Sequence, residues 1–224
     1  MKKWLLLVLL PLLLLILFVL VQNRDAVNMT FRQKMLRTIY PLLARVTKKA
    51  GPNGVTARPD RPVTPPVSPF VLKITLIDGD TCTLEKFRGR KILLVNTASD
   101  CGYTGQYASL QALQEKYADK LVVIGFPAND FKEQEKAGNE QIAAFCQRNY
   151  GVTFPLSAKV SVVKGAGQDP VFQWLSDPAR NGWNDRPPVW NFTKFLIDEQ
   201  GRLTGYFGPA VDPLDPAFIS VLEP

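Results

Sequence analysis

Two hydrophobic patterns alternate along residues 71–207 of this 224-residue chain. Short continuous apolar runs occupy 91–96 and 121–126, which is typical of strands buried on both faces of a sheet. Apolar residues spaced three or four apart occupy 107–117 and 139–148, which is typical of helices packed on such a sheet. The alternation of strand and helix predicts an α/β domain.

Hairpin-like stretches flank this unit. A predicted strand over 71–77 runs into the turn Asp78-Gly79-Asp80. Near the other end, 195–198 and 202–207 are separated by Glu199-Gln200-Gly201, which predicts an antiparallel hairpin. A β-α-β unit followed by a hairpin is the order of a thioredoxin-like fold, and we expect that fold over residues 70–224.

The N-terminus carries a different pattern. Residues 4–21 are uninterruptedly apolar and include eleven leucines, and a helix of this length spans about 27 Å. We therefore expect a transmembrane anchor helix over 1–23. A cleaved signal peptide is the alternative, although no small-residue cleavage site follows the run. A third alternative is a shorter chain that begins at Met29.

The charges around this run give conflicting signals about orientation. Lys2 and Lys3 precede it, and four basic residues follow it between positions 24 and 37. The positive-inside rule would retain the second group in the cytoplasm, whereas a very short basic tail usually leaves the N-terminus inside and exports the rest. We expect a single-pass, membrane-anchored protein whose domain lies on the extracytoplasmic or periplasmic side.

Two further segments separate the apolar run from the domain. Residues 24–50 show helical spacing of apolar residues among basic ones, which predicts a basic juxtamembrane helix lying on an anionic lipid surface. A helix packed on the domain and a solvated stalk are the alternatives. Residues 51–69 contain six prolines, which predicts an extended, semi-rigid linker.

Composition narrows the chemistry. The formal net charge is +7, but residues 1–68 hold 11 Lys+Arg against 2 Asp+Glu, whereas 69–224 hold 16 against 18. The slightly acidic domain argues against a nucleic-acid partner. The absence of histidine excludes a Ser-His-Asp triad and histidine-ligated metal sites, and three cysteines are too few for a four-cysteine zinc site. We expect no metal and no cofactor.

Cys101 is the candidate reactive group. It follows the predicted strand 91–96 and precedes the predicted helix 107–117, and such loops carry the reactive groups of α/β sheets. Backbone N–H groups at a helix start lower the pKa of a thiol from its usual ~8.5. The neighbours Asp100 and Gly102 argue against deep burial, so we expect an activated thiol rather than an apolar core cysteine.

Four blocks of sequence, in order, resemble the motifs of glutathione peroxidases. They are Val95-Asn-Thr-Ala-Ser-Asp-Cys-Gly-Tyr-Thr104, Gly125-Phe-Pro-Ala-Asn-Asp-Phe-Lys-Glu-Gln-Glu135, Asn139–Pro155 and Trp190-Asn-Phe-Thr-Lys-Phe-Leu-Ile-Asp198. The third is similar to the thioredoxin-dependent members. Together the blocks are far more specific than any one alone.

The resemblance implies a catalytic tetrad of Cys101, Gln134, Trp190 and Asn191. The thiolate would attack the O–O bond of hydrogen peroxide or of an organic or lipid hydroperoxide, in defence against oxidative stress. The three neutral side chains can donate hydrogen bonds to the sulfur or the peroxide oxygens. The resemblance also implies a thioredoxin-like protein or glutathione as reductant.

The other two cysteines differ in what the resemblance implies. Cys146 lies where thioredoxin-dependent members carry the resolving cysteine, so it would form a disulfide with the oxidised Cys101. Cys82 lies outside all four blocks and is expected to be structural. The short segment after the second helix is similar to that of monomeric members, so we expect a monomer.

The chain departs from the family pattern at two positions. Ala128 and Asp130 stand where the family usually has Cys and Gln. The first loses a thiol that is generally not required. The second introduces a carboxylate near the expected site, with an effect on substrate preference whose sign the sequence does not predict.

Other thiol-dependent classes fit less well. The peroxiredoxin pattern Pro-x-x-x-Thr-x-x-Cys is absent, because Thr97 lies four residues before Cys101 instead of three. A disulfide oxidoreductase would need a second cysteine at position 104, where this chain has Thr104, and a copper-delivery protein would need histidine. The alternative from another functional class is a non-catalytic, membrane-anchored binding module with a thioredoxin fold.

Overall fold

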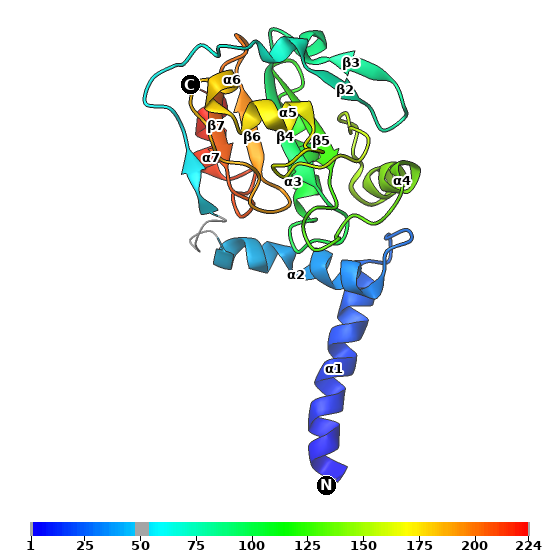
Figure 1. Ribbon diagram of the computed structural model, residues 1–224. Coiled ribbons are helices and arrows are strands. Elements are labelled where there is room, and N and C mark those ends of the chain that lie inside the picture. Colours follow the sequence, from blue (N-terminus) through cyan, green and yellow to red (C-terminus); the bar gives the residue numbers. More distant parts are fainter. Residues whose placement is uncertain (1, 48–53, 224) are drawn as a thin grey trace.

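A five-stranded mixed sheet of order β1-β7-β6-β4-β5 forms the centre of the domain (Figure 1). The computed structural model describes residues 2–47 and 54–223. The strands are β1 Thr56–Ala57, β2 Lys73–Thr75, β3 Thr81–Thr83, β4 Lys91–Thr97, β5 Leu121–Pro127, β6 Lys194–Ile197 and β7 Leu203–Phe207. The helices are α1 Lys2–Gln22, α2 Phe31–Thr47, α3 Gln106–Lys116, α4 Asn139–Tyr150, α5 Pro170–Leu175, α6 Pro178–Asn181 and α7 Pro216–Leu222, with 3-10 turns at Pro69–Val71 and Leu84–Phe87.

The β-α-β unit and the final hairpin are confirmed. β4 pairs in parallel with β5 and antiparallel with β6, and β6 pairs antiparallel with β7. The first hairpin is shorter than predicted, because β2 and β3 pair over only three residues each and form a separate two-stranded sheet. The arrangement is the thioredoxin-like α/β fold that the sequence predicted.

Two cores lie on opposite faces of the sheet. Along β4, Leu93 and Val95 pack with residues of α3, α4 and α7, whereas Ile92 and Leu94 pack with residues of α5. Successive side chains of a strand point to opposite faces, so both faces of β4 are apolar and the strand is fully buried. Each large side chain removed from water in this way contributes about 1.5–3 kcal/mol.

The segment expected to be a linker is partly attached to the domain. Residues 51–53 lie outside the described residues, but β1 pairs antiparallel with the outer edge of β7. Further along, the Val67 carbonyl accepts a hydrogen bond from Nε1 of Trp174 at 2.7 Å. Pairing satisfies backbone groups that an exposed strand edge would leave open.

The N-terminal helix α1 contains the whole apolar run of residues 4–21. Among the residues that the structure describes, no helix combines the length and the apolar character needed to cross a membrane. The transmembrane anchor expected over 1–23 is therefore not supported. Asn23 joins α1 to the next helix, because its buried Nδ2 donates to the Val19 carbonyl at 2.9 Å and to Oγ1 of Thr38 at 2.7 Å.

Of the basic helix expected over 24–50, the structure shows α2 over Phe31–Thr47. Residues 24–30 are not helical, and residues 48–50 lie outside the described part. It packs below the domain in Figure 1. The Tyr40 hydroxyl donates to the Asp212 carboxylate at 2.6 Å, and a Cβ added to Gly105 would lie 2.5 Å from the Tyr40 ring. The alternative of a helix packed on the domain thus describes α2.

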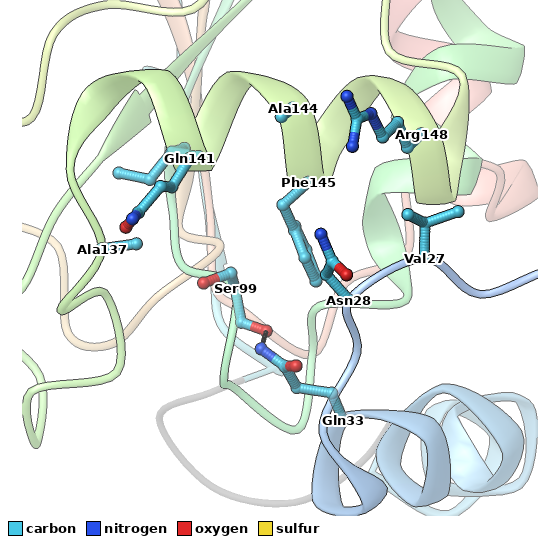
Figure 2. Close-up of a pocket in the computed structure, with 10 residues that line it drawn as sticks. Val27, Asn28, Gln33, Ser99, Ala137, Gln141, Ala144, Phe145 and Arg148 are labelled. Carbon is cyan, nitrogen blue, oxygen red and sulfur yellow. Dashed lines mark hydrogen bonds between the residues drawn. The ribbon is translucent and has the colours of Figure 1, made fainter.

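A cavity of about 340 Å³ separates the segment before α2 from α4 (Figure 2). Its walls include Val27 and Gln33 on one side and Phe145 and Arg148 of α4 on the other. At one end of α4, the backbone of Val27 exchanges two hydrogen bonds, of 2.8 and 3.0 Å, with the Asn149 side chain. The N-terminal segment is therefore tied to the helix that carries Cys146.

Candidate active site

Cys101 lies in the turn that joins the end of β4 to the start of α3. Thr104 shapes this turn, because its Oγ1 accepts from the Cys101 N–H at 3.0 Å and donates to the Ala98 carbonyl at 2.9 Å. The turn directs the Tyr103 N–H at the Cys101 sulfur, 3.4 Å away. The sulfur therefore faces a backbone donor just before a helix begins.

The other three expected site residues come from two distant segments. Gln134 lies between β5 and α4, and Trp190 and Asn191 precede β6. The side chains of Trp190 and Asn191 act on the Cys101 thiol, and both lower its pKa. Nδ2 of Asn191 also donates to Oε1 of Gln134 at 3.0 Å. The structure thus brings all four residues together, with Gln134 joined to the group through Asn191.

Asn96, at the end of β4, holds the segment that carries Trp190. Its Nδ2 donates to the Trp190 carbonyl at 3.1 Å, and its Oδ1 accepts from the Thr193 N–H at 3.0 Å. The Asn96 carbonyl accepts from the N–H of Phe192, whose positive φ of 66° is unfavourable for a bulky residue. The sequence analysis assigned no role to Asn96. Its position in the first of the four family blocks could have marked it as a residue that supports the site.

Cys101 is fully buried, contrary to the expectation drawn from its polar neighbours. Burial raises the pKa of its thiol, because a charged sulfur would lose its hydration. The hydrogen bonds from the Tyr103 N–H, Trp190 and Asn191 lower this pKa but are outweighed by burial. The expectation of a lowered pKa for Cys101 is therefore wrong, because burial favours the neutral thiol. The donors stabilise the thiolate after it has formed.

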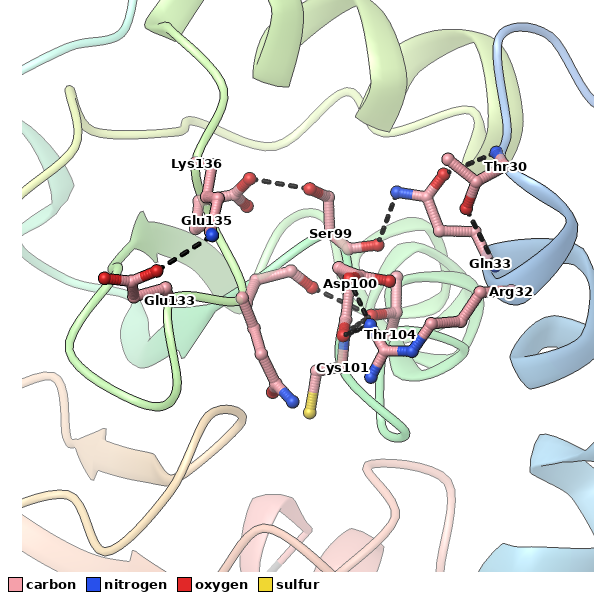
Figure 3. Close-up of polar contacts among 12 residues, drawn as sticks. Thr30, Arg32, Gln33, Ser99, Asp100, Cys101, Thr104, Glu133, Glu135 and Lys136 are labelled. Atoms are coloured by element: carbon pink, nitrogen blue, oxygen red, sulfur yellow. Dashed lines mark hydrogen bonds and ion pairs between the residues drawn. The ribbon is translucent and has the colours of Figure 1, made fainter.

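Residues 99 and 100, just before Cys101, are bonded from two sides (Figure 3). On one side, the Ser99 hydroxyl donates to Oε1 of Glu135 at 2.6 Å. Oε2 of Glu135 is buried and has no hydrogen-bond partner among the described residues. Burial raises the pKa of this carboxyl to about 7. On the other side lies Arg32, a residue that no sequence pattern marked.

The two remaining cysteines are free thiols in this structure. Cys146 is buried on α4, and burial raises the pKa of its thiol to about 12. The Tyr107 hydroxyl interacts with it and acts in the opposite direction. Cys82 is half-buried on β3 and packs against the core on the α5 face. Its position agrees with a structural role.

The two departures from the family pattern lie within packed structure. Ala128 is fully buried, and its N–H donates to the Thr97 carbonyl at 3.0 Å. The Asp130 carboxylate accepts from the Ser161 hydroxyl and from the Val162 N–H, both at 2.8 Å. The carboxylate introduced at position 130 is thus bonded to a neighbouring loop.

No cluster of three or more Cys, Asp or Glu side chains suited to hold a metal ion occurs within the described residues. The groups around Cys101 are instead hydrogen-bond donors. Such donors can stabilise a thiolate and can transfer or share a proton with a leaving oxygen. The arrangement is suited to nucleophilic chemistry at sulfur.

Comparisons with known proteins agree with this chemistry. The model of the family described as "Glutathione peroxidase" matches residues 70–176. The "Glutathione peroxidase homolog BsaA" of Bacillus subtilis (strain 168) is 38% identical over 160 residues, which cover 70% of this chain and 99% of the relative. The "Glutathione peroxidase-like peroxiredoxin gpx1" of Schizosaccharomyces pombe is 46% identical over 127 residues, covering 56% of this chain and 79% of the relative.

Solved structures support the same assignment. The crystal structure of Trgpx in apo form aligns with a TM-score of 0.51 at 31% identity, covering 70% of this chain and 97% of that one. A thioredoxin family protein from Chlorobium tepidum aligns with a TM-score of 0.50 at 17% identity, covering 73% and 99%, and this shows the fold alone. The chain belongs to the glutathione peroxidase family and is a peroxidase of the oxidoreductase class.

Proposed function

We propose that the protein reduces hydrogen peroxide and organic or lipid hydroperoxides through Cys101, with Cys146 as the resolving cysteine and a thioredoxin-like protein as the reductant. The observation that carries the proposal is the set of donors around one sulfur. The Tyr103 N–H donates to the Cys101 sulfur at 3.4 Å, and the Trp190 and Asn191 side chains lower the pKa of the same thiol.

In the first half-reaction the Cys101 thiolate attacks one oxygen of the hydroperoxide. A sulfur–oxygen bond forms, the O–O bond breaks, and the second oxygen leaves as an alcohol or as water after it takes a proton. The sulfur is oxidised to a sulfenic acid. Oδ1 of Asn191 is buried and has no hydrogen-bond partner among the described residues, so it can accept the O–H of the incoming hydroperoxide.

In the second half-reaction the Cys146 thiol attacks the sulfenic acid. A Cys101–Cys146 disulfide forms and water leaves. The α carbons of bridged cysteines lie within about 7 Å, and Cys146 is buried on α4, so local opening of this helix would bring the two thiols together. The dithiol of a thioredoxin-like protein then reduces the disulfide, returns both thiols and is itself oxidised to a disulfide.

The cysteine variants of the full chain test both steps. Peroxide consumption is measured with thioredoxin, thioredoxin reductase and NADPH. Cys101→Ser should abolish turnover, whereas Cys82→Ser, the matched change on β3, should retain it. Turnover by Cys101→Ser at the wild-type rate would refute the proposal.

Cys146→Ser separates the reductants. We expect this variant to react once with hydrogen peroxide, to accumulate a sulfenic acid that dimedone traps, and to lose turnover with thioredoxin. Mass spectrometry of the oxidised wild type should identify a peptide that joins Cys101 to Cys146. Full turnover of Cys146→Ser with thioredoxin would refute the resolving role, and turnover of the wild type with glutathione alone would identify glutathione as the reductant.

A further inference from the structure

The loop that presents Cys101 is anchored on its inner side by the segment before α4. The Asp100 N–H donates to the Gln134 carbonyl at 3.1 Å, and the Ser99 hydroxyl donates to Glu135 at 2.6 Å. These contacts lie within the stretch that the family model matches. They fix one side of the loop just before the reactive cysteine.

The outer side of the same loop is held by two consecutive residues of α2. Nη1 of Arg32 donates to the Asp100 carbonyl at 3.1 Å and also contacts the Asp100 carboxylate. Nε2 of Gln33 donates to the Ser99 carbonyl at 3.2 Å, while its Oε1 accepts from the Thr30 N–H and thereby orients the amide. Figure 3 shows both sets of contacts meeting at residues 99 and 100.

The helix that supplies these residues lies outside residues 70–176, yet it is tied to the domain at other points. The Tyr40 hydroxyl bonds Asp212, and the Val27 backbone bonds Asn149. Arg32 is therefore placed against the loop by contacts that do not depend on its own side chain.

We propose that Arg32 is a positioning residue of the peroxidase reaction: it holds the Cys101 loop from the N-terminal segment and neutralises the Asp100 carboxylate beside the reacting sulfur. The inference rests on the proposed peroxidase function and adds to it a charged group from outside the residues that the family model matches. Without Arg32, an uncompensated negative charge on Asp100 would oppose formation of the Cys101 thiolate.

The Arg32–Asp100 pair is half exposed, so as an ion pair it contributes little to stability. Its effect is instead local, because the same guanidinium also bonds the loop backbone next to Cys101. Other charged side chains near the site include Glu135, which bonds Ser99, and Lys132, whose Nζ lies 5.7 Å from the centre of the Trp190 ring. Neither of these side chains bonds Asp100 in the structure.

The test uses the full chain with the variants Arg32→Gln, Arg32→Lys and Arg37→Gln. Arg37 is the matched control, because it lies on the same helix but bonds Asp25 and faces the Tyr150 ring instead of the Cys101 loop. Stopped-flow fluorescence gives the rate constant of the reduced protein with hydrogen peroxide. We expect Arg32→Gln to lower it about five- to tenfold, Arg32→Lys to recover part of the loss, and Arg37→Gln to stay within about twofold of the wild type.

A second readout reports charge alone. The rates of Cys101 alkylation by anionic iodoacetate and by neutral iodoacetamide are compared in a Cys82→Ser, Cys146→Ser background. Their ratio should fall about two- to threefold in Arg32→Gln and recover when Asp100→Asn is added. The inference would be overturned if Arg32→Gln kept the peroxide rate constant and the alkylation ratio of the wild type. It would also be overturned if Arg37→Gln lost as much of the peroxide rate as Arg32→Gln, because the loss would then come from weaker docking of α2.

The two proposals fail in different ways. If the wild type does not consume peroxide, the proposed function fails, whereas the alkylation ratio still decides whether Arg32 acts on Cys101. If Arg32→Gln does not fold, as judged by thermal melting, the Asp100→Asn single variant tests the inference in its place. Neutralising Asp100 should then leave the peroxide rate equal to or above that of the wild type, and a lower rate would overturn the inference.

Discussion

The Asn191 amide donates a hydrogen bond of 3.0 Å to Oε1 of Gln134, although the two residues are 57 positions apart in the chain. Asn191 also lowers the pKa of the Cys101 thiol, so its amide links the nucleophile to the glutamine. With Oε1 of Gln134 occupied as an acceptor, the NH₂ group of the same side chain remains a donor. The NH₂ group of Gln134 can therefore serve as a donor to the reacting atoms.

Removing this donor should slow the chemical step. We expect Gln134→Ala to lower the rate constant of Cys101 with hydrogen peroxide by about 10²-fold, because one preorganised donor to the developing charge is lost. Stopped-flow measurement on the reduced protein checks this. Gln147→Ala, a change on the exposed side of α4, is the matched control and should leave the rate unchanged. An unchanged rate in Gln134→Ala would exclude a direct role.

The indole N–H of Trp190 can be tested separately from its packing. The Trp190 ring lies 5.5 Å from that of Phe131, a contact that Trp190→Phe largely keeps while it removes the indole N–H. We expect a fall in the peroxide rate of about tenfold or more. Trp183→Phe removes an N–H that donates to the Leu203 carbonyl at 2.7 Å, away from the site, so stability should change but the rate should not. Equal rates in the two variants would contradict the assignment.

The pH dependence of the first step follows from the burial of Cys101. Burial holds the pKa of this thiol above its usual range, so the thiolate is the minor form near neutrality. Below that pKa the thiolate fraction grows about tenfold per pH unit, and the rate constant with hydrogen peroxide should rise accordingly between pH 6 and 8, on the order of one logarithmic unit per pH unit. Stopped-flow mixing across this range measures it. A rate that is constant from pH 6 upward would contradict a raised pKa.

Glu135 should make stability depend on pH. Its pKa is raised from 4.5 to about 7, so the folded state binds more protons than the unfolded chain between these values. Protonation of Glu135 therefore stabilises the folded state below about pH 4.5, and this contribution is lost as the pH rises through about 7. Glu135→Gln removes this dependence, so its free energy of unfolding should rise relative to that of the wild type from pH 5 to pH 8, by at most about 3 kcal/mol.

Urea denaturation of the wild type and of Glu135→Gln at several pH values measures this change in the free energy of unfolding. Glu133→Gln is the control, because this carboxylate is exposed and paired with Lys136. The control should show no such rise. A constant difference between Glu135→Gln and the wild type at all pH values would mean that the carboxyl is ionised throughout.

Much of the domain could be predicted from local pattern. β4, β5, α3 and α4 were predicted because buried strands and amphipathic helices carry different hydrophobic periods, and these periods are set by backbone geometry alone. The types of the four site residues were likewise readable, because each belongs to a short block of sequence. The β1 pairing was missed, since two residues in a proline-rich segment carry no period.

What the tertiary structure decided is how these residues meet. Cys101 is fully buried, and Trp190, Asn191 and Arg32, all far from it in the chain, act on its thiol, so the direction of its pKa could not be inferred from its polar neighbours. The contact of Arg32 with Asp100 spans 68 positions and two segments with no shared pattern. The sequence by itself determined the elements and the chemical groups, because these depend on residues near in the chain, whereas only folding determined the environment of the sulfur, because desolvation and charge depend on distance in space.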